Sequence, residues 1–451
     1  MASFTPHTPA EVDAMLGFLG LTSTEELFST VPAGLRLDRP LDLAAGMSEP
    51  DVLARFDFLA SANRGAAGDL VCFAGGGAYD HDIPAVVRSL AFRSEFVTAY
   101  TPYQAEVAQG VLQALFEYQT MVCRLTGMDV ANASLYDGAS ACVEAVNLAV
   151  AATGRSTVWV SRGLNPNWRA VLSTFAAGTG HDLVDVDLAD GRTAWPTSAG
   201  SGHGDHAPPA ALLLACPNYL GCLEEVSEAR RMADEVGALL VVAVDPVAMG
   251  LLRPPGEMGA DIVVGEGQSL GMPLSFGGPY LGLFACRREH VRRLPGRLVG
   301  ETVDVDGRRA YVTTLRTREQ DIRREKASSN VCTNQTLMAV AFLVHLAWLG
   351  TAGLRGLALR CARATSYTRD GLLGLDGVEP AATAPFLLEF AVRTPVPGSI
   401  VVERMADEGF LAGVPLATAD GHGEGLLVAV TERRTRAEID DYVAAFGKVL
   451  R

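Results

Sequence analysis

The stretch Val241-Val-Ala-Val-Asp-Pro246 places an acidic residue directly after a run of four apolar residues. A short, continuous apolar run of this kind predicts a strand buried on both faces of a parallel sheet. Asp245 then lies at the carboxyl edge of that sheet, where α/β proteins bind their ligands. About twenty residues further on, Val264–Pro279 is rich in glycine and contains no lysine. These two stretches predict the fold class and the position of a site.

Short apolar runs and helical stretches alternate on both sides of this strand. The expected strands are Thr157–Ser161, Leu183–Asp187, Ala211–Ala215, Leu239–Val244, Ile262–Val264 and Leu281–Ala285. The expected helices are Gln104–Leu125, Ala139–Ala152, Trp168–Ala176, Glu224–Val236, Pro246–Leu252 and Gln335–Leu349. Strand–helix alternation predicts an α/β fold with a mostly parallel sheet that is covered on both faces.

The length of 451 residues predicts more than one domain, since a single core stops growing at roughly 250–300 residues. Residues 1–70 are polar and fragmented, which indicates an N-terminal helical arm. Residues 71–325 carry the strand–helix alternation and form the expected large α/β domain. Residues 326–451 are expected to form a smaller C-terminal α+β domain.

The composition excludes several classes of partner. With 37 basic and 52 acidic residues, the net charge of −15 argues against binding to nucleic acid. No apolar run reaches the roughly 20 residues that span a bilayer, so no membrane is expected, and the first ten residues do not resemble a signal peptide. The eight cysteines form no Cys-x-x-Cys pair, which favours reduced thiols and a cytoplasmic location.

Lysine is almost absent from this chain. Only Lys326 and Lys448 are present, so 35 of the 37 basic residues are arginine. We attribute this imbalance mainly to nucleotide composition. Chemistry that needs a lysine amine therefore has two candidates.

Two features suggest a site. The turn Ala99–Glu106 carries Tyr100, Tyr103 and Gln104, which would give aromatic walls with hydroxyl and amide groups, or form an ordinary packing turn. The second feature is Asp245, because an acidic residue in this place holds the pyridine nitrogen in vitamin B6 enzymes of the aspartate aminotransferase fold.

Six segments, in order along the chain, resemble one family: the subunit 1 (α) branch of the two-chain glycine dehydrogenase (decarboxylating), the P-protein of the glycine cleavage system. These segments are Arg36–Leu43, Gly75–Val87, Ser94–Gly110, Gly127–Ala141, Gly271–Gly282 and Thr317–Gln335. The resemblance implies the pyridoxal-phosphate-dependent transferase fold, which is aspartate aminotransferase-like and of fold type I.

In this family the cofactor lysine lies on a homologous β chain. Laying the β pattern over Gly267–Pro279 puts Gln268 at the position of the Schiff-base lysine. An amide is not nucleophilic and cannot form the imine. The resemblance thus implies that pyridoxal 5'-phosphate is bound on the partner β subunit, that Asp245 is vestigial, and that this chain holds no covalent cofactor, no catalytic residue and no metal.

The resemblance also implies an activity. An αβ or α2β2 (heterotetrameric) enzyme decarboxylates glycine and transfers the aminomethyl group to the lipoyl arm of the H-protein, with release of CO2, within a system that includes the T- and L-proteins. By analogy, Tyr100, Tyr103 and Gln104 contact the partner's active site or its substrate. Thr333 and Asn334 are further interface candidates.

Three alternatives stay open from the sequence. Asn165 stands where the family has histidine, which leaves room for a paralogous decarboxylase subunit that acts on another small amino acid. A noncatalytic regulatory or scaffold homologue is a second alternative. A third is an autonomous B6 enzyme that uses Lys326, although that residue lies in a charged run away from the strand that carries Asp245.

Overall fold

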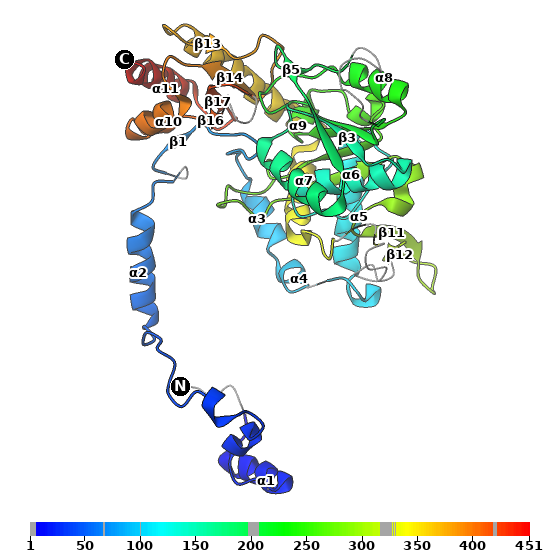
Figure 1. Ribbon diagram of the computed structural model, residues 1–451, viewed down its shortest axis with the longest axis vertical. Coiled ribbons are helices and arrows are strands. Elements are labelled where there is room, and N and C mark those ends of the chain that lie inside the picture. The colour runs from blue at the N-terminus through cyan, green and yellow to red at the C-terminus, as the bar shows by residue number, and fades with distance from the viewer. Residues whose placement is uncertain are drawn as a thin grey trace. The chain divides into compact units, whose positions relative to one another are not determined.

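The computed structural model describes residues 6–65, 68–99, 101–196, 207–315, 327, 329, 331–417 and 422–451 (Figure 1). Tyr100 and Lys326 lie outside these residues. The chain divides into two compact units, Met1–Arg64 and Gly65–Arg451.

Unit 1 consists of helices and 3-10 turns without a core of its own. Its elements are α1 (Pro9–Leu19), η1 (Thr24–Phe28), η2 (Ala33–Leu35) and α2 (Glu49–Ser61). Thr8 begins α1 with a capping box to Glu11. Leu16 is buried, whereas many large apolar side chains of the described part of the unit are exposed, with Phe18 at 91%.

A seven-stranded sheet forms the centre of unit 2, in the order β2-β10-β9-β8-β7-β3-β4. Its strands are β2 (Val130–Ala131), β3 (Thr157–Ser161), β4 (Asp182–Val186), β7 (Ala211–Ala215), β8 (Leu239–Val244), β9 (Ile262–Glu266) and β10 (Gly282–Cys286). Neighbours from β4 to β9 are parallel, while β10 is antiparallel to β9 and β2. The six expected strands and the mostly parallel sheet are confirmed.

Helices bury both faces of this sheet. Alternate residues of β8 point to opposite sides, so that Val242 joins one core and Val241 joins the other. The first face is covered by α5 (Gln109–Thr126), α8 (Val226–Val236) and α9 (Thr336–Leu373), and the second by α6 (Gly138–Thr153) and α7 (Pro166–Thr179). The continuous apolar runs of the strands follow from burial on both sides.

The helix expected over Pro246–Leu252 is wrong, because the chain forms only a short 3-10 turn, η4 (Ala248–Gly250). The carboxylate of Asp245 accepts hydrogen bonds from the amides of Val247 and Ala248. A side-chain acceptor of this type stabilises a turn in place of a regular helix.

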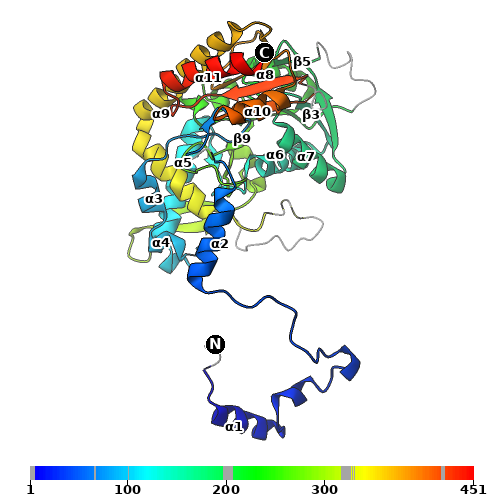
Figure 2. The same cartoon turned by 90° about the vertical axis from the view of Figure 1, so that its left-hand side faces the viewer.

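Helix α9 is longer than expected and bends at Gly350, whose φ of 58° lies outside the helical region. Figure 2 shows it running from the side of α3 (Ala85–Ala91) to that of α11 (Arg436–Val449). Its composition would allow it to span a membrane. However, Phe342 and Cys361 are buried in the core beside the central sheet, which is typical of a core helix.

A four-stranded antiparallel sheet, β13-β14-β17-β16, organises the C-terminal part. It consists of β13 (Glu379–Pro380), β14 (Glu389–Arg393), β16 (Val414–Leu416) and β17 (Gly425–Ala429), packed against α10 (Gly398–Asp407) and α11. β1 (Val71–Cys72) pairs with β15 (Phe410–Leu411), and Phe73 joins this core. The domain divisions at residues 70 and 325 stay a prediction.

The remaining elements are short. They are α4 (Ser94–Val97), η3 (Ala105–Val107), β5 (Leu188–Ala189), β6 (Arg192–Thr193), η5 (Pro255–Met258), η6 (Arg288–Arg293), β11 (Leu298–Val303) and β12 (Arg309–Thr314). β11 and β12 form a hairpin against α5.

Candidate functional site

A cleft lies at the carboxyl edge of the central sheet, where β8 and β9 end. It encloses about 460 Å³, including the solvent at its mouth. We name it the Asp245 cleft, and its lining residues are Gly77, Tyr79, Asn165, Trp168, Ala215, Pro217, Asn218, Tyr219, Ala243, Val244, Asp245, Glu266 and Glu389. The cleft lies at the edge of the sheet where the sequence predicts a site, and its role stays a prediction.

Asp245 lies where expected, but its oxygens are used within the chain. Oδ1 accepts the amide hydrogens of Val247 and Ala248 at 2.8 and 2.9 Å, and the Ser269 hydroxyl donates to Oδ2 at 3.3 Å. Burial raises the pKa of this carboxyl above its usual value. Asp245 therefore serves as a local acceptor in this chain.

Gln268 is fully buried and joins two segments of the cleft. Its Oε1 accepts the amide hydrogen of Tyr79 at 2.8 Å, and its Nε2 donates to the carbonyl oxygens of Tyr79 and Met272 at 3.0 and 2.9 Å. The amide thus satisfies both backbone groups of Tyr79. At the position where the family pattern has lysine, this side chain is a structural crosslink.

The N-terminus of α6 points toward the same region, and helix N-termini are the usual binding sites of phosphate groups. Here the carboxylate of Glu266 accepts the amide hydrogen of Gly138 at 2.9 Å, together with those of Gln268 and Leu281. A β-carbon on Gly138 would lie 2.3 Å from Trp168 Cζ2, so the indole packs directly against this first residue of α6. With the Glu266 side chain bonded to the Gly138 amide and no lysine among the described lining residues, the described lining of the cleft does not fit pyridoxal phosphate.

Glu389 closes the cleft from the C-terminal sheet. Its Oε1 accepts from the Tyr79 hydroxyl at 2.8 Å and its Oε2 from the Gly76 amide at 3.1 Å. Burial raises the pKa of Glu389 to about 7. Sequence reasoning missed Glu389, Glu266 and Tyr79. Two of them, Glu266 and Tyr79, lie within segments already described from the sequence, Val264–Pro279 and Gly75–Val87.

The remaining predicted site residues are not among the described residues that line this cleft. Tyr103 is 55% exposed, with the Arg297 guanidinium 5.5 Å from its ring centre, and Gln104 is also exposed. Thr333 is half-buried. Asn334 donates to the Ala133 carbonyl at 2.7 Å and accepts from Thr336. Asn334 thus has a structural contact of its own.

The two buried acids predict how stability depends on pH. Burial raises the pKa of Glu266 to about 8, and that of Glu389 to about 7, from a usual 4.5. Between pH 4.5 and these raised pKa values, the two side chains hold protons in the folded chain that they have released in the unfolded chain. The free energy of unfolding should therefore fall as the pH rises from about 4.5 to 8. Urea unfolding across this range measures the slope, and Glu266→Gln should flatten it. An equal slope in the variant would contradict the assignment.

The fold is that of the pyridoxal-phosphate-dependent fold type I class. Glutamate decarboxylase of Lactobacillus brevis is 12% identical, with a TM-score of 0.67 that covers 93% of this chain and 96% of that one. At this identity the likeness shows the fold alone, and the predicted fold class is confirmed.

The chain belongs to the glycine cleavage system P-protein family, whose model matches residues 2–446. A relative from Moorella thermoacetica, "probable glycine dehydrogenase (decarboxylating) subunit 1", is 49% identical over 99% of this chain and 100% of its own length. A crystal structure of glycine decarboxylase (P-protein) in inhibitor-bound form is 43% identical, with a TM-score of 0.90 over 99% of this chain and 100% of that one. The resemblance found in the sequence is confirmed.

Proposed function

We propose that this chain is the α subunit of a glycine decarboxylase, which decarboxylates glycine and transfers the aminomethyl group to the lipoyl arm of the H-protein with release of CO2. One observation carries the division of labour: Gln268 is fully buried and bonded at the position of the family's lysine. Full-length relatives named as subunit 1 support the activity. Of the three alternatives, a paralogue for another amino acid and a scaffold homologue are not favoured by these names. The third, an autonomous B6 enzyme that uses Lys326, falls on a residue outside the described ones.

The cofactor belongs, in this proposal, to the second subunit. Pyridoxal phosphate supplies an electron sink for decarboxylation when it is bound. In this chain Gln268 offers no amine, Glu266 takes the α6 amide of Gly138, and Asp245 accepts from its own backbone. These residues keep the Asp245 cleft closed by internal contacts.

The proposed partners are the second (β) subunit, the lipoylated H-protein, and the T- and L-proteins of the cleavage system. Relatives named as subunit 1 support a second subunit as a partner. All eight cysteines are free, which fits the reducing cytoplasm as the proposed location.

Tyr103 and Gln104 are the proposed contacts with the partner's active site, together with Tyr100, Thr333 and Asn334. The exposure of Tyr103 and Gln104 supports this role, because a surface of this chain must face the partner. Aromatic walls there would shape the pocket and exclude water.

Reconstitution tests the proposal. Glycine–bicarbonate carbon exchange is measured with this chain, the β subunit and lipoylated H-protein, each omitted in turn. Exchange should require this chain and the β subunit. With pyridoxal phosphate and borohydride, this chain alone should retain no covalently attached cofactor, while the β subunit does.

Cofactor reduced onto a lysine of this chain would overturn the lysine-free assignment. Full exchange without this chain would overturn its role as a required subunit.

A further inference from the structure

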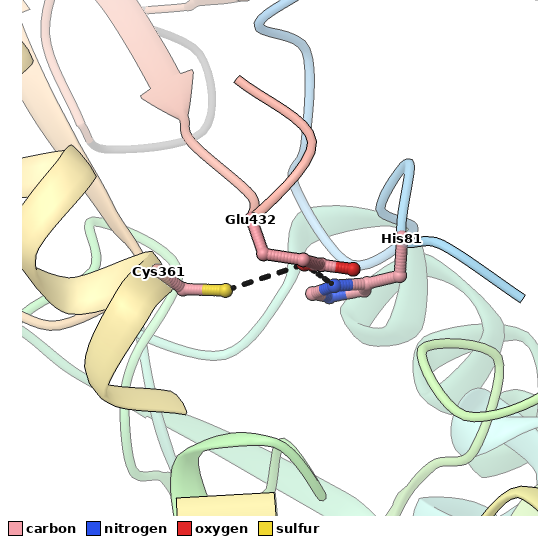
Figure 3. Close-up of side chains that lie close together, drawn as sticks. All are labelled: His81, Cys361 and Glu432. Carbon is pink, nitrogen blue, oxygen red and sulfur yellow. Dashed lines mark hydrogen bonds and ion pairs between the residues drawn. The ribbon is translucent and has the colours of Figure 1, made fainter. Parts of the chain in front are cut away.

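Three potential metal ligands meet where the loop before α3, helix α9 and the loop after β17 come together (Figure 3). His81 Nδ1 lies 2.7 Å from Glu432 Oε2, and Cys361 Sγ lies 3.4 Å from the same oxygen. All three ligand atoms fall within 4.8 Å of one another. The side chains of His81 and Glu432 are only 5% and 7% exposed, and Cys361 is fully buried.

Imidazole nitrogen, thiolate sulfur and carboxylate oxygen are the ligands that Zn²⁺ takes in proteins, in tetrahedral geometry. Ordinary zinc–ligand lengths place such atoms roughly 3.3–3.6 Å apart. The atoms of this cluster therefore need to move by less than about 1 Å to surround one ion. A dication with one thiolate and one carboxylate is also neutral, which burial favours.

A backbone hydrogen bond orients the Glu432 carboxylate, as is usual for carboxylates that bind metals. Its Oε1 accepts the amide hydrogen of Asp82 at 2.7 Å, which leaves Oε2 for His81 and Cys361. Arg433 and Arg434 both pair with Asp80. The two loops that supply His81 and Glu432 are thus fixed to each other without the ion.

His345 supplies a second observation beside the cluster. It is 2% exposed, and its Nδ1 has no hydrogen-bond partner among the residues that the structure describes. His345, Asp82 and Glu432 line one groove of about 1080 Å³. An orphaned, buried imidazole nitrogen is unusual and calls for an explanation, and the groove offers an ion a path to Glu432.

We propose that His81, Cys361 and Glu432 bind one zinc-class divalent cation, whose fourth position faces the groove that His345 lines. Binding replaces the Cys361 thiol proton, which leaves for solvent, by a sulfur–metal bond, with no change of oxidation state. His81 coordinates as the neutral ring with its proton on Nε2, so that the Nδ1 lone pair, which faces Glu432, is free for the ion. The ion would clamp the loop that carries Tyr79 to α9 and to the C-terminal sheet. This structural role is independent of the proposed decarboxylase activity.

Cobalt titration of the chelator-treated, full-length chain tests the site, because Co²⁺ reports a bound thiolate through a charge-transfer absorption band. We expect one equivalent to bind with this band, and Zn²⁺ to displace it and raise the melting temperature. Cys361→Ser, which keeps a hydroxyl for Glu432, should lose the band and weaken binding at least tenfold.

Cys142→Ser is the matched control, since Cys142 is equally buried in helix α6, and its band should match that of the unaltered chain. Glu432→Gln provides a second test should Cys361→Ser fail to fold; it keeps the thiolate but removes the charged oxygen ligand, and it should weaken Co²⁺ binding at least tenfold. Absence of stoichiometric Co²⁺ binding by the unaltered chain, or an unchanged band in Cys361→Ser, would overturn the proposal. Metal binding without glycine exchange would leave it standing and contradict only the proposed function.

Discussion

Gln268→Leu is expected to lower the free energy of unfolding by about 2 kcal/mol or more, since it strands two backbone groups at about 1–3 kcal/mol each. Those groups are the amide of Tyr79 and the carbonyl of Met272, whereas the Tyr79 carbonyl keeps the amide hydrogen of His81. Leucine has a similar volume, so the lost hydrogen bonds dominate the change. Urea-induced unfolding of the full chain measures the effect.

Gln113→Leu is the matched control. Its amide donates to Glu117 at 2.9 Å on the exposed side of α5, so its loss should change stability by less than about 0.5 kcal/mol. Equal effects of the two substitutions would show that the buried amide does not hold the Tyr79 segment.

Tyr103→Ala is expected to lower kcat/KM of the reconstituted complex about 100-fold, as loss of substrate positioning commonly does. The unfolding free energy of the isolated chain should change by about 1 kcal/mol or less, because the ring is 55% exposed and its contact with Arg297 is a single cation–π pair. Steady-state glycine–bicarbonate exchange with saturating β subunit and H-protein provides the measurement. Tyr103→Phe distinguishes the contribution of the aromatic ring to kcat/KM from that of the hydroxyl.

Tyr367→Ala controls for the loss of an exposed tyrosine. Tyr367 is 39% exposed and its ring lies 5.2 Å from the Arg436 guanidinium, so it makes a similar contact on α9. Exchange should be unaffected by this variant. If the Tyr103 and Tyr367 variants are equally active, the proposed contact at Tyr103 is wrong.

The central sheet could be predicted because its signal is local. The inner parallel strands β3, β7, β8 and β9 are buried on both faces and therefore consist of short, mainly apolar runs, whereas the edge strand β4 is only partly buried. Asp245 follows the end of β8. The helix expected after Asp245 failed because that carboxylate binds the next amides. This contact depends on side-chain geometry, which apolar periodicity does not encode.

The polar contacts around the cleft could not be predicted, because they join residues remote in sequence. Gln268 meets Tyr79 across 189 positions, and Gly76 meets Glu389 across 313. Aligning the family's lysine pattern with Gly267–Pro279 identified Gln268 as a site residue. Nothing in the sequence near Glu389 indicated a site. Side-chain partners of this kind appear only once the C-terminal sheet is packed.

The Glu266 carboxylate at the first turn of α6 affects how easily this chain could evolve a lysine-bearing cofactor site of its own. A lysine restored at position 268 would leave the Tyr79 amide hydrogen without its acceptor. It would also find Glu266 bonded to Gly138, with Trp168 against the same residue. Reversal therefore needs several coordinated substitutions, and each one alone is destabilising or useless. The present contacts therefore act against the stepwise gain of a lysine site in this cleft.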